Sequence, residues 1–69
     1  MQDQNSIAYK IRKFRKEKNM SQEELSTLSG INISTIKKYE GGARNPKPDQ
    51  LLKITNALGI SINAIMEFE

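Results

Sequence analysis

The stretch that decides the fold spans residues 21–42 and reads SQEELSTLSGINISTIKKYEGG. Ser21 followed by Glu24 is typical of a capping box, in which each side chain satisfies a free backbone amide at the start of a helix. Gly30 then ends the helix, because glycine adopts the left-handed backbone conformation at little cost. The pattern predicts a helix over about 22–29.

A second short helix is predicted directly after this turn. Asn32 is a favoured N-cap residue, and Gly41 and Gly42 mark the end of a helix over about 33–41. Ile36 faces inward with Tyr39, since successive residues are about 100° apart around a helix. The opposite side is polar and cationic and carries Ser34, Lys37 and Lys38, with Ile33 and Thr35 at its two edges.

A longer helix is predicted before this pair, over residues 6–18. Its apolar stripe at helical spacing consists of Ile7, Ile11 and Phe14. Ser6 or Asn5 can cap its first turn. The stripe indicates that one side of this helix is buried and that the other side faces solvent.

Two further helices are predicted after the pair. Pro48 suits the first position of a helix that ends at Gly59, and Ser61 can cap a final short helix. Residues 60–62 alternate between apolar and polar side chains, but three residues are too few to predict a strand. The inward side chains expected from 22–29 and from the helix that begins at Pro48 are Leu25, Leu28, Leu51, Ile54 and Leu58, with Leu52 beside them, and the final short helix carries Ile62, Ile65 and Met66. The predicted fold is all-α, a compact five-helix domain over residues 1–69.

The composition excludes several kinds of site. The chain has 69 residues with no Cys and no His, so a disulfide, a thiolate nucleophile, a Ser-His pair and a His or Cys metal ligand are impossible. No apolar run approaches the ~18 residues of a membrane span, and residues 1–5 do not begin a secretory signal. We expect no catalytic residue, no metal, no cofactor and no membrane partner.

Positive charge is concentrated in two blocks of the sequence. Lys and Arg number 11 against 8 Asp and Glu, a net charge of +3. All of these cations except Lys53 lie within residues 1–18 and 32–48, while most acidic residues lie elsewhere. The uneven distribution predicts a basic face on the folded chain.

Two short helices joined by a turn that contains glycine, the second with a basic outer side, form a helix-turn-helix arrangement. The characteristic segments are SQEELS (21–26), SGIN (29–32), TI (35–36), YEGG (39–42), NP (45–46), LL (51–52) and ALGIS (57–61). With these segments at this spacing, residues 7–67 resemble the XRE family of helix-turn-helix domains, the phage repressor and Cro type. The resemblance implies a lambda-repressor-like fold and a sequence-specific DNA-binding transcriptional regulator, most often a repressor.

The resemblance also implies that helix 33–41 enters the major groove of double-stranded DNA. Base contacts then fall to Ile33, Ser34, Lys37 and Lys38. Ile33 offers only apolar contact to a thymine methyl group, with partial burial as the alternative, and for Lys37 the alternative is solvation or phosphate contact. The expected phosphate contacts are Gln22, Asn32, Thr35, Arg44, Asn45 and Lys47. Of the cations on helix 6–18, only those on the groove-facing side could reach DNA, and a solvated surface is favoured for most of Lys10, Arg12, Lys13 and Lys16.

Two expectations concern stability and assembly. Arg15 and Glu40 each border an inward stripe, and the resemblance implies a structural ion pair between them that sets the angle of helix 33–41. The apolar residues at the carboxyl end exceed what one short helix needs for docking, which predicts a homodimer interface. This interface consists of Ile62, Ile65, Met66 and Phe68, and closure of the core is the alternative role.

Other classes of function compete with DNA binding. The same fold can serve as a protein-interaction module or as an antitoxin that acts through a protein partner, and a regulatory protein partner is compatible with either. An enzyme is disfavoured, because Glu23 and Glu24 suit helix capping and the helix dipole better than acid-base chemistry. A cytoplasmic location follows only from the expected function.

Overall fold

The computed structural model describes residues 6–66, which form four α-helices and a short 3-10 turn. The elements are α1 (Ile7–Glu17), α2 (Gln22–Ser29), α3 (Ile33–Gly41), α4 (Pro48–Leu58) and the turn η1 (Ile62–Ala64). No strand occurs within these residues, which confirms the all-α prediction. None of the helices in this described part is long and apolar enough to cross a membrane.

The predicted fifth α-helix is wrong. Ser61 does cap the segment, accepting a hydrogen bond from the amide of Asn63 at 3.1 Å. The chain then makes one 3-10 turn, with hydrogen bonds from Ala64 to Ser61 and from Ile65 to Ile62, rather than a full helix. A segment this short forms few hydrogen bonds after nucleation, and burial of Ile65 already fixes its position.

The helix starts follow the predicted capping chemistry. The Ser6 side chain accepts from the amide of Tyr9 at 3.0 Å, and Pro48 occupies the first turn of α4. Both halves of the capping box at α2 are present, from Glu24 N to Ser21 Oγ at 3.0 Å and from Ser21 N to Glu24 Oε1 at 2.8 Å. These local contacts explain why the helix boundaries could be read from the sequence.

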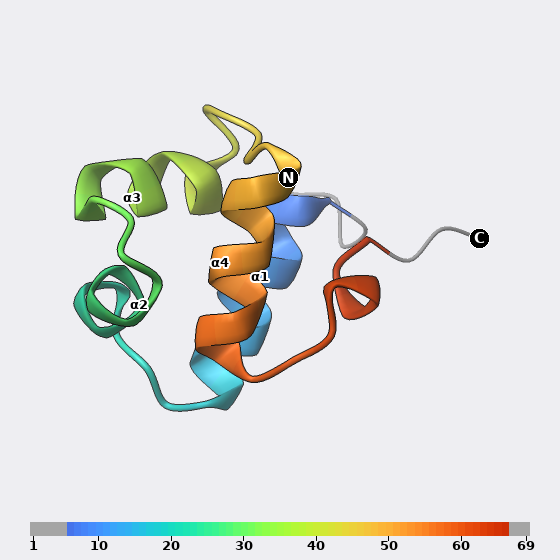
Figure 1. Cartoon of the computed structure of the whole chain (residues 1–69). Coiled ribbons are helices and arrows are strands. Elements are labelled where there is room, and N and C mark those ends of the chain that lie inside the picture. The colour runs from blue at the N-terminus through green and yellow to red at the C-terminus, as the bar shows by residue number, and fades with distance from the viewer. Residues whose placement is uncertain (1–5, 67–69) are drawn as a thin grey trace.

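The helices are arranged so that α3 lies at an edge of the molecule (Figure 1). Helices α1 and α4 pack against each other in the centre, α2 packs against α4, and α3 packs against α1 and α2. The η1 turn contacts α4 on the side away from α2 (Figure 1). One side of α3 is therefore supported by two helices while its outer side faces solvent.

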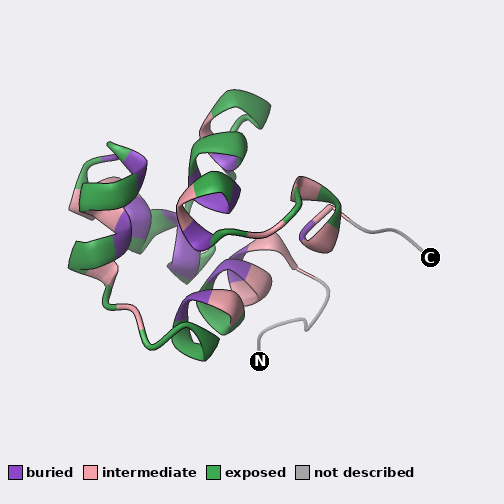
Figure 2. Ribbon diagram, turned by 60° about the horizontal axis from the view of Figure 1, so that its bottom comes forward, coloured by how far each residue is buried: buried purple, intermediate pink, exposed green. Residues whose placement is uncertain are grey.

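The core is formed where the helices face one another (Figure 2). Its fully buried apolar side chains are Ile11, Leu25, Ile36, Leu51, Ile54, Leu58 and Ile65. The inward prediction for Leu28 is wrong, since this side chain is 62% exposed. Helix α2 is short, and Leu25 and Ser29 already occupy its buried side, which leaves Leu28 on the flank.

The turn between α2 and α3 is fixed by hydrogen bonds from both sides. The Ser26 hydroxyl donates to the carbonyl of Ile31, and the amide of Ile31 donates to Ser29 Oγ at 3.2 Å. The Ile31 side chain is buried in the core, and Gly30 has a φ of 75°. The direction in which α3 leaves α2 is therefore set by a short connection that these hydrogen bonds and the buried Ile31 side chain hold in place.

Replacing Gly30 tests the backbone requirement of this turn. A Cβ at Gly30 would meet no atom within 4 Å, so Gly30→Ala introduces backbone strain without a clash. We expect a loss of about 1 to 2 kcal/mol in unfolding free energy, measured by urea denaturation. The control is Gly41→Ala, which also meets no atom but has no positive φ and should leave stability equal or slightly higher. Equal stability of the two variants would contradict the conclusion that the turn requires a left-handed backbone at Gly30.

Candidate nucleic-acid interface

The outer side of α3 carries residues predicted from the sequence to contact bases. Ser34, Lys37 and Lys38 are exposed, whereas Ile33 is partly buried. Opposite to them, Ile36 is fully buried and anchors the helix in the core. We call the exposed side formed by Ser34, Lys37 and Lys38 the α3 ridge.

The first turn of α3 is ordered by a side-chain cap that also orients one ridge residue. Asn32 Oδ1 accepts from the amide of Ser34 at 2.8 Å and from the Ser34 hydroxyl at 2.7 Å. The carbonyl oxygen of Asn32 is thereby engaged, and its amide nitrogen remains the donor group of this side chain. The Ser34 hydroxyl donates its proton to this cap, so toward a ligand its oxygen can act as an acceptor.

A hollow borders the ridge on the side of the loop that follows α3. Its lining brings together Asn32, Thr35, Arg44, Asn45 and Lys47, which are five of the six residues predicted to contact phosphate. Residues 44 and 45 are exposed, as is Lys47 at the N-cap of α4. We call this depression the loop-side hollow. Three segments of the chain therefore supply donors to one surface.

Two polar residues of α4 that line the loop-side hollow were missed from the sequence. Gln50 and Lys53 line it from the first turns of α4. They are three residues apart and so lie on one side of the helix. In the sequence Lys53 lies outside the two basic blocks, although its spacing from Gln50 and the start of the helix at Pro48 were available as a signal.

The predicted pair of Arg15 and Glu40 meets in a buried bidentate ion pair. Arg15 Nε lies 2.6 Å from Glu40 Oε2, and the second guanidinium nitrogen donates to Oε1 at 3.0 Å. A third donor of Arg15 bonds to the carbonyl of Met20 at 2.7 Å. The side chains of Arg15 and Glu40 are only 10% and 4% exposed. The pair joins α1 to the last turn of α3 and to the segment that leads into α2.

Gln22, the sixth residue predicted to contact phosphate, lies apart from the loop-side hollow. Its side-chain amide donates to Glu40 Oε1 at 3.2 Å, and the residue is partly buried. Gln22 is the first residue of α2, where backbone amides are not bonded within the helix. The side chain therefore supports the ion pair in this structure, while the start of α2 offers backbone donors beside it.

The carboxyl-terminal residues predicted to form a dimer interface do not share one environment. Ile65 is 2% exposed and belongs to the core, so its assignment to an interface is wrong. Ile62 and Met66 are partly buried and pack against the core. Phe68 lies outside the described residues. Ile65 is unavailable to an interface because η1 has only one turn, and packing this turn against α4 buries the Ile65 side chain that follows it.

No group of acidic side chains that could hold a metal ion occurs within residues 6–66. The chemical character of the surface comes instead from guanidinium, ammonium, amide and hydroxyl groups around α3. All of these groups can donate hydrogen bonds, and the first two carry positive charge. The arrangement suits an extended anionic ligand.

Comparison with known protein families gives one match that covers most of the chain. The helix-turn-helix family model matches residues 11–65. The chain is 39% identical over 51 residues to the cryptic phage CTXphi transcriptional repressor RstR of Vibrio cholerae, a match that covers 74% of this chain and 46% of that protein. The chain thus spans about half the length of this relative.

Solved structures with the same fold cover nearly the whole chain. The restriction-modification controller protein C.AhdI from Aeromonas hydrophila has a TM-score of 0.83 and 34% identity, covering 86% of this chain and 89% of that one. SinR, a master regulator for biofilm formation solved in complex with DNA, has a TM-score of 0.84 and 29% identity, covering 88% of this chain and 98% of that one. These proteins are regulators rather than enzymes.

The Glu40→Ala variant tests the buried ion pair. Removal of the Glu40 carboxylate leaves the Arg15 guanidinium buried without its partner, and we expect a loss of about 3 kcal/mol in unfolding free energy. For a domain of this size the melting temperature should fall by more than about 10 °C, as followed by circular dichroism. Glu17→Ala, which removes an exposed carboxylate from α1, should change stability by less than about 0.5 kcal/mol. A melt of Glu40→Ala equal to that of the parent would contradict a structural role for the pair.

Proposed function

The chain belongs to the XRE family of helix-turn-helix domains, and from this premise we propose that it is a transcriptional regulator, acting as a repressor, that binds specific sequences in double-stranded DNA. In this proposal α3 enters the major groove. The whole 69-residue chain acts as one DNA-binding domain.

The observation that carries the proposal is the exposure of the α3 ridge above a buried side. Ser34 and Lys38 are exposed on a helix whose opposite side chain, Ile36, is fully buried in the core. A helix held in this way at the edge of the molecule can enter the ~12 Å major groove without exposing the core. The named relatives support the proposal, since RstR is a transcriptional repressor and SinR was solved with DNA.

The base contacts follow from the donors and acceptors of the ridge. Lys37 and Lys38 donate to guanine O6 or N7, and Ser34 accepts from an exocyclic amine of adenine or cytosine. Ile33, at the edge of the ridge, contacts a thymine methyl group. These contacts supply sequence preference, whereas contacts to the backbone fix the register of α3 in the groove.

The phosphate contacts come mainly from the loop-side hollow. Arg44 and Lys47 contribute charge, and Asn32, Thr35 and Asn45 contribute neutral donors. We add Lys53, which shares the hollow, to this set. Gln22 acts at the start of α2, where unbonded backbone amides and the positive end of the helix dipole favour an anion.

A homodimer is part of the proposal. Two copies related by two-fold symmetry read two half-sites about 34 Å apart, which gives more specificity than one helix can provide. With Ile65 in the core, the members of the predicted interface left for the contact within residues 6–66 are the partly buried Ile62 and Met66. Because a regulator of this kind acts where it can reach DNA, the proposed location is cytoplasmic.

The second candidate function is a helix-turn-helix module or antitoxin that acts mainly through a protein partner. The exposed Leu28 and Leu52, 62% and 48% accessible, favour it to a limited degree because apolar surface is typical of protein contacts. They lie on α2 and α4 rather than on α3, and Leu28 lines a hollow together with Lys53. Variants of the α3 ridge can therefore separate the two functions by experiment.

Binding to random duplex DNA at increasing salt tests the proposed function. Each phosphate contact contributes about 0.9 to the slope of log affinity against log salt concentration. We expect a negative slope of several units, measured by fluorescence anisotropy. Absence of binding at ~50 mM salt would sink the proposal and favour the protein partner.

Selection of bound sequences from a random duplex pool separates base contacts from phosphate contacts. Lys38→Ala should lose preference at one base pair by about 1 to 3 kcal/mol, because a direct contact to a base edge disappears. Arg44→Ala should weaken all sequences alike and lower the salt slope by about 1. The spacing of selected half-sites reports the dimer. If Lys38→Ala keeps the base preference of the parent chain, Lys38 does not contact a base.

A further inference from the structure

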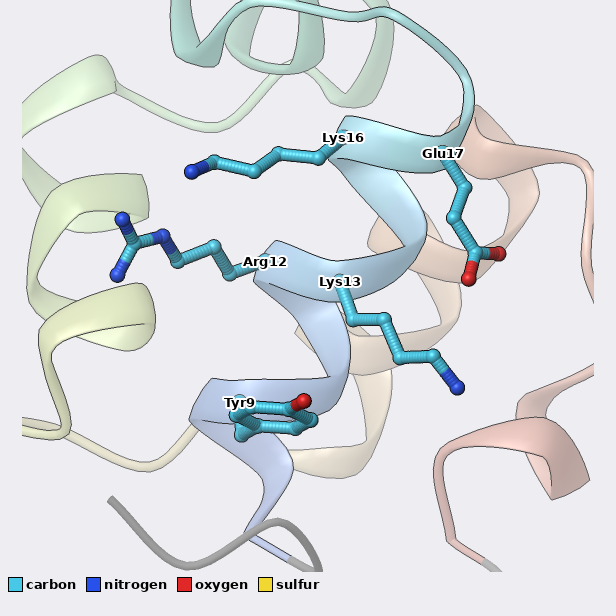
Figure 3. Close-up of a pocket in the computed structure, with 5 residues that line it drawn as sticks. All are labelled: Tyr9, Arg12, Lys13, Lys16 and Glu17. Atoms are coloured by element: carbon cyan, nitrogen blue, oxygen red, sulfur yellow. The ribbon is translucent and has the colours of Figure 1, made fainter. Parts of the chain in front are cut away.

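Two exposed cations of α1 have no role in the proposed function. Arg12 and Lys16 are four residues apart and lie on the same side of the helix. Figure 3 shows that both side chains extend toward α3, while Lys13 and Glu17 extend to the other side of α1. The sequence could not separate these cations, because their direction depends on how α1 is rotated against α3.

A second hollow borders α3 on the side opposite to the loop-side hollow. It is lined by Arg12 and Arg15 from α1, Gln22 from α2, and Lys37, Glu40 and Gly41 from α3. We call it the α1-side hollow. Its lining contains three cationic side chains and one carboxylate, and that carboxylate accepts hydrogen bonds from Arg15 and Gln22. The hollow is therefore positive, with Arg12 and Lys37 exposed at its margin.

The α3 ridge thus runs between two basic hollows. Helical geometry puts Thr35 and Tyr39 on one flank of α3 and Lys37 and Glu40 on the other, and the two linings divide in the same way. A helix in the major groove of B-DNA has the phosphates of one strand on each side. The loop-side hollow would face one strand, which leaves the α1-side hollow to face the other.

We infer that Arg12 and Lys16 hold backbone phosphates of the DNA strand on the α1 side, so that α3 is clamped from both of its flanks. This inference rests on the proposed function. The ligand is the phosphodiester backbone, so the contact adds affinity and fixes register without reading sequence. Guanidinium suits this ligand because it can donate two hydrogen bonds to one phosphate.

The other exposed or partly exposed cations of α1 are directed elsewhere and define the controls. Lys10 Nζ donates to the carbonyl of Ile65 at 3.4 Å, which ties α1 to the segment after η1. Lys13 Nζ lies 5.4 Å from the centre of the Phe14 ring. Lys13 therefore has the same charge as Lys16 and stands on the same helix. It lines a hollow on α1 together with Arg12 and Lys16, but its side chain extends to the side of α1 away from α3.

Binding of the full chain to one selected duplex, measured across a range of salt, tests the clamp. The variants are Arg12→Gln, Lys16→Gln and the double variant, with Lys13→Gln as the matched loss of one charge. All three positions are exposed, so the fold should persist, and circular dichroism verifies it. Each clamp variant should bind about five- to tenfold more weakly at ~0.1 M salt and lower the salt slope by about 0.9, and the double variant by about twice that.

The outcomes separate the clamp from the proposed function. If Arg12→Gln and Lys16→Gln bind like Lys13→Gln while Arg44→Ala binds more weakly, the clamp is overturned and DNA binding through α3 stands. If the parent chain itself does not bind duplex DNA, the proposed function fails and the clamp fails with it. Weaker binding and a lower salt slope in both clamp variants, with Lys13→Gln near the parent, supports the clamp.

Discussion

The buried ion pair between Arg15 and Glu40 is the interaction on which the surface of this domain depends. Its bidentate geometry, with distances of 2.6 and 3.0 Å, fixes both the separation and the rotation of α1 against α3. Arg15 also bonds to the carbonyl of Met20, so the same guanidinium holds the chain that leads into α2. Burying these charges is costly, and the bonds around them offset that cost only while both partners are present.

The ion pair between Arg15 and Glu40 stabilises the fold and also fixes the direction of α3, the helix proposed to enter the groove. Helix α3 has only nine residues and would not form a stable helix alone, so its direction must come from its neighbours. The α2–α3 turn sets one end of α3, through Ser26, Ser29 and Gly30, and the ion pair sets the other end. Ser34 and Lys38 are exposed between two supports that leave the helix little freedom. Such preorganisation lowers the entropic cost of binding a rigid duplex.

Because the position of α3 is fixed, the cations around it lie on two defined flanks of the helix. Cations that are far apart in the sequence, such as Arg12, Lys37 and Arg44, lie in two hollows on opposite flanks of one helix. A modest net charge of +3 is compatible with strong local attraction when it is concentrated in this way. A duplex has the same two-sided form, with a strand of phosphates on each side of the groove.

The sequence alone indicated the bounds of the four α-helices and the turn between α2 and α3, because caps, glycines and helical spacing act over a few residues. The partners of the ion pair, 25 residues apart, followed instead from the resemblance to the helix-turn-helix family. The sequence also pointed to the exposed side of α3, since Ile36 and Tyr39 fix the opposite side. Only the tertiary structure decided that Leu28 is exposed, that Ile65 is buried and that Lys53 lines the loop-side hollow, because each of these depends on how separate helices pack. The direction of Arg12 and Lys16 is of the same kind. Periodicity defines which residues share a side of a helix, whereas contacts between helices define what that side faces.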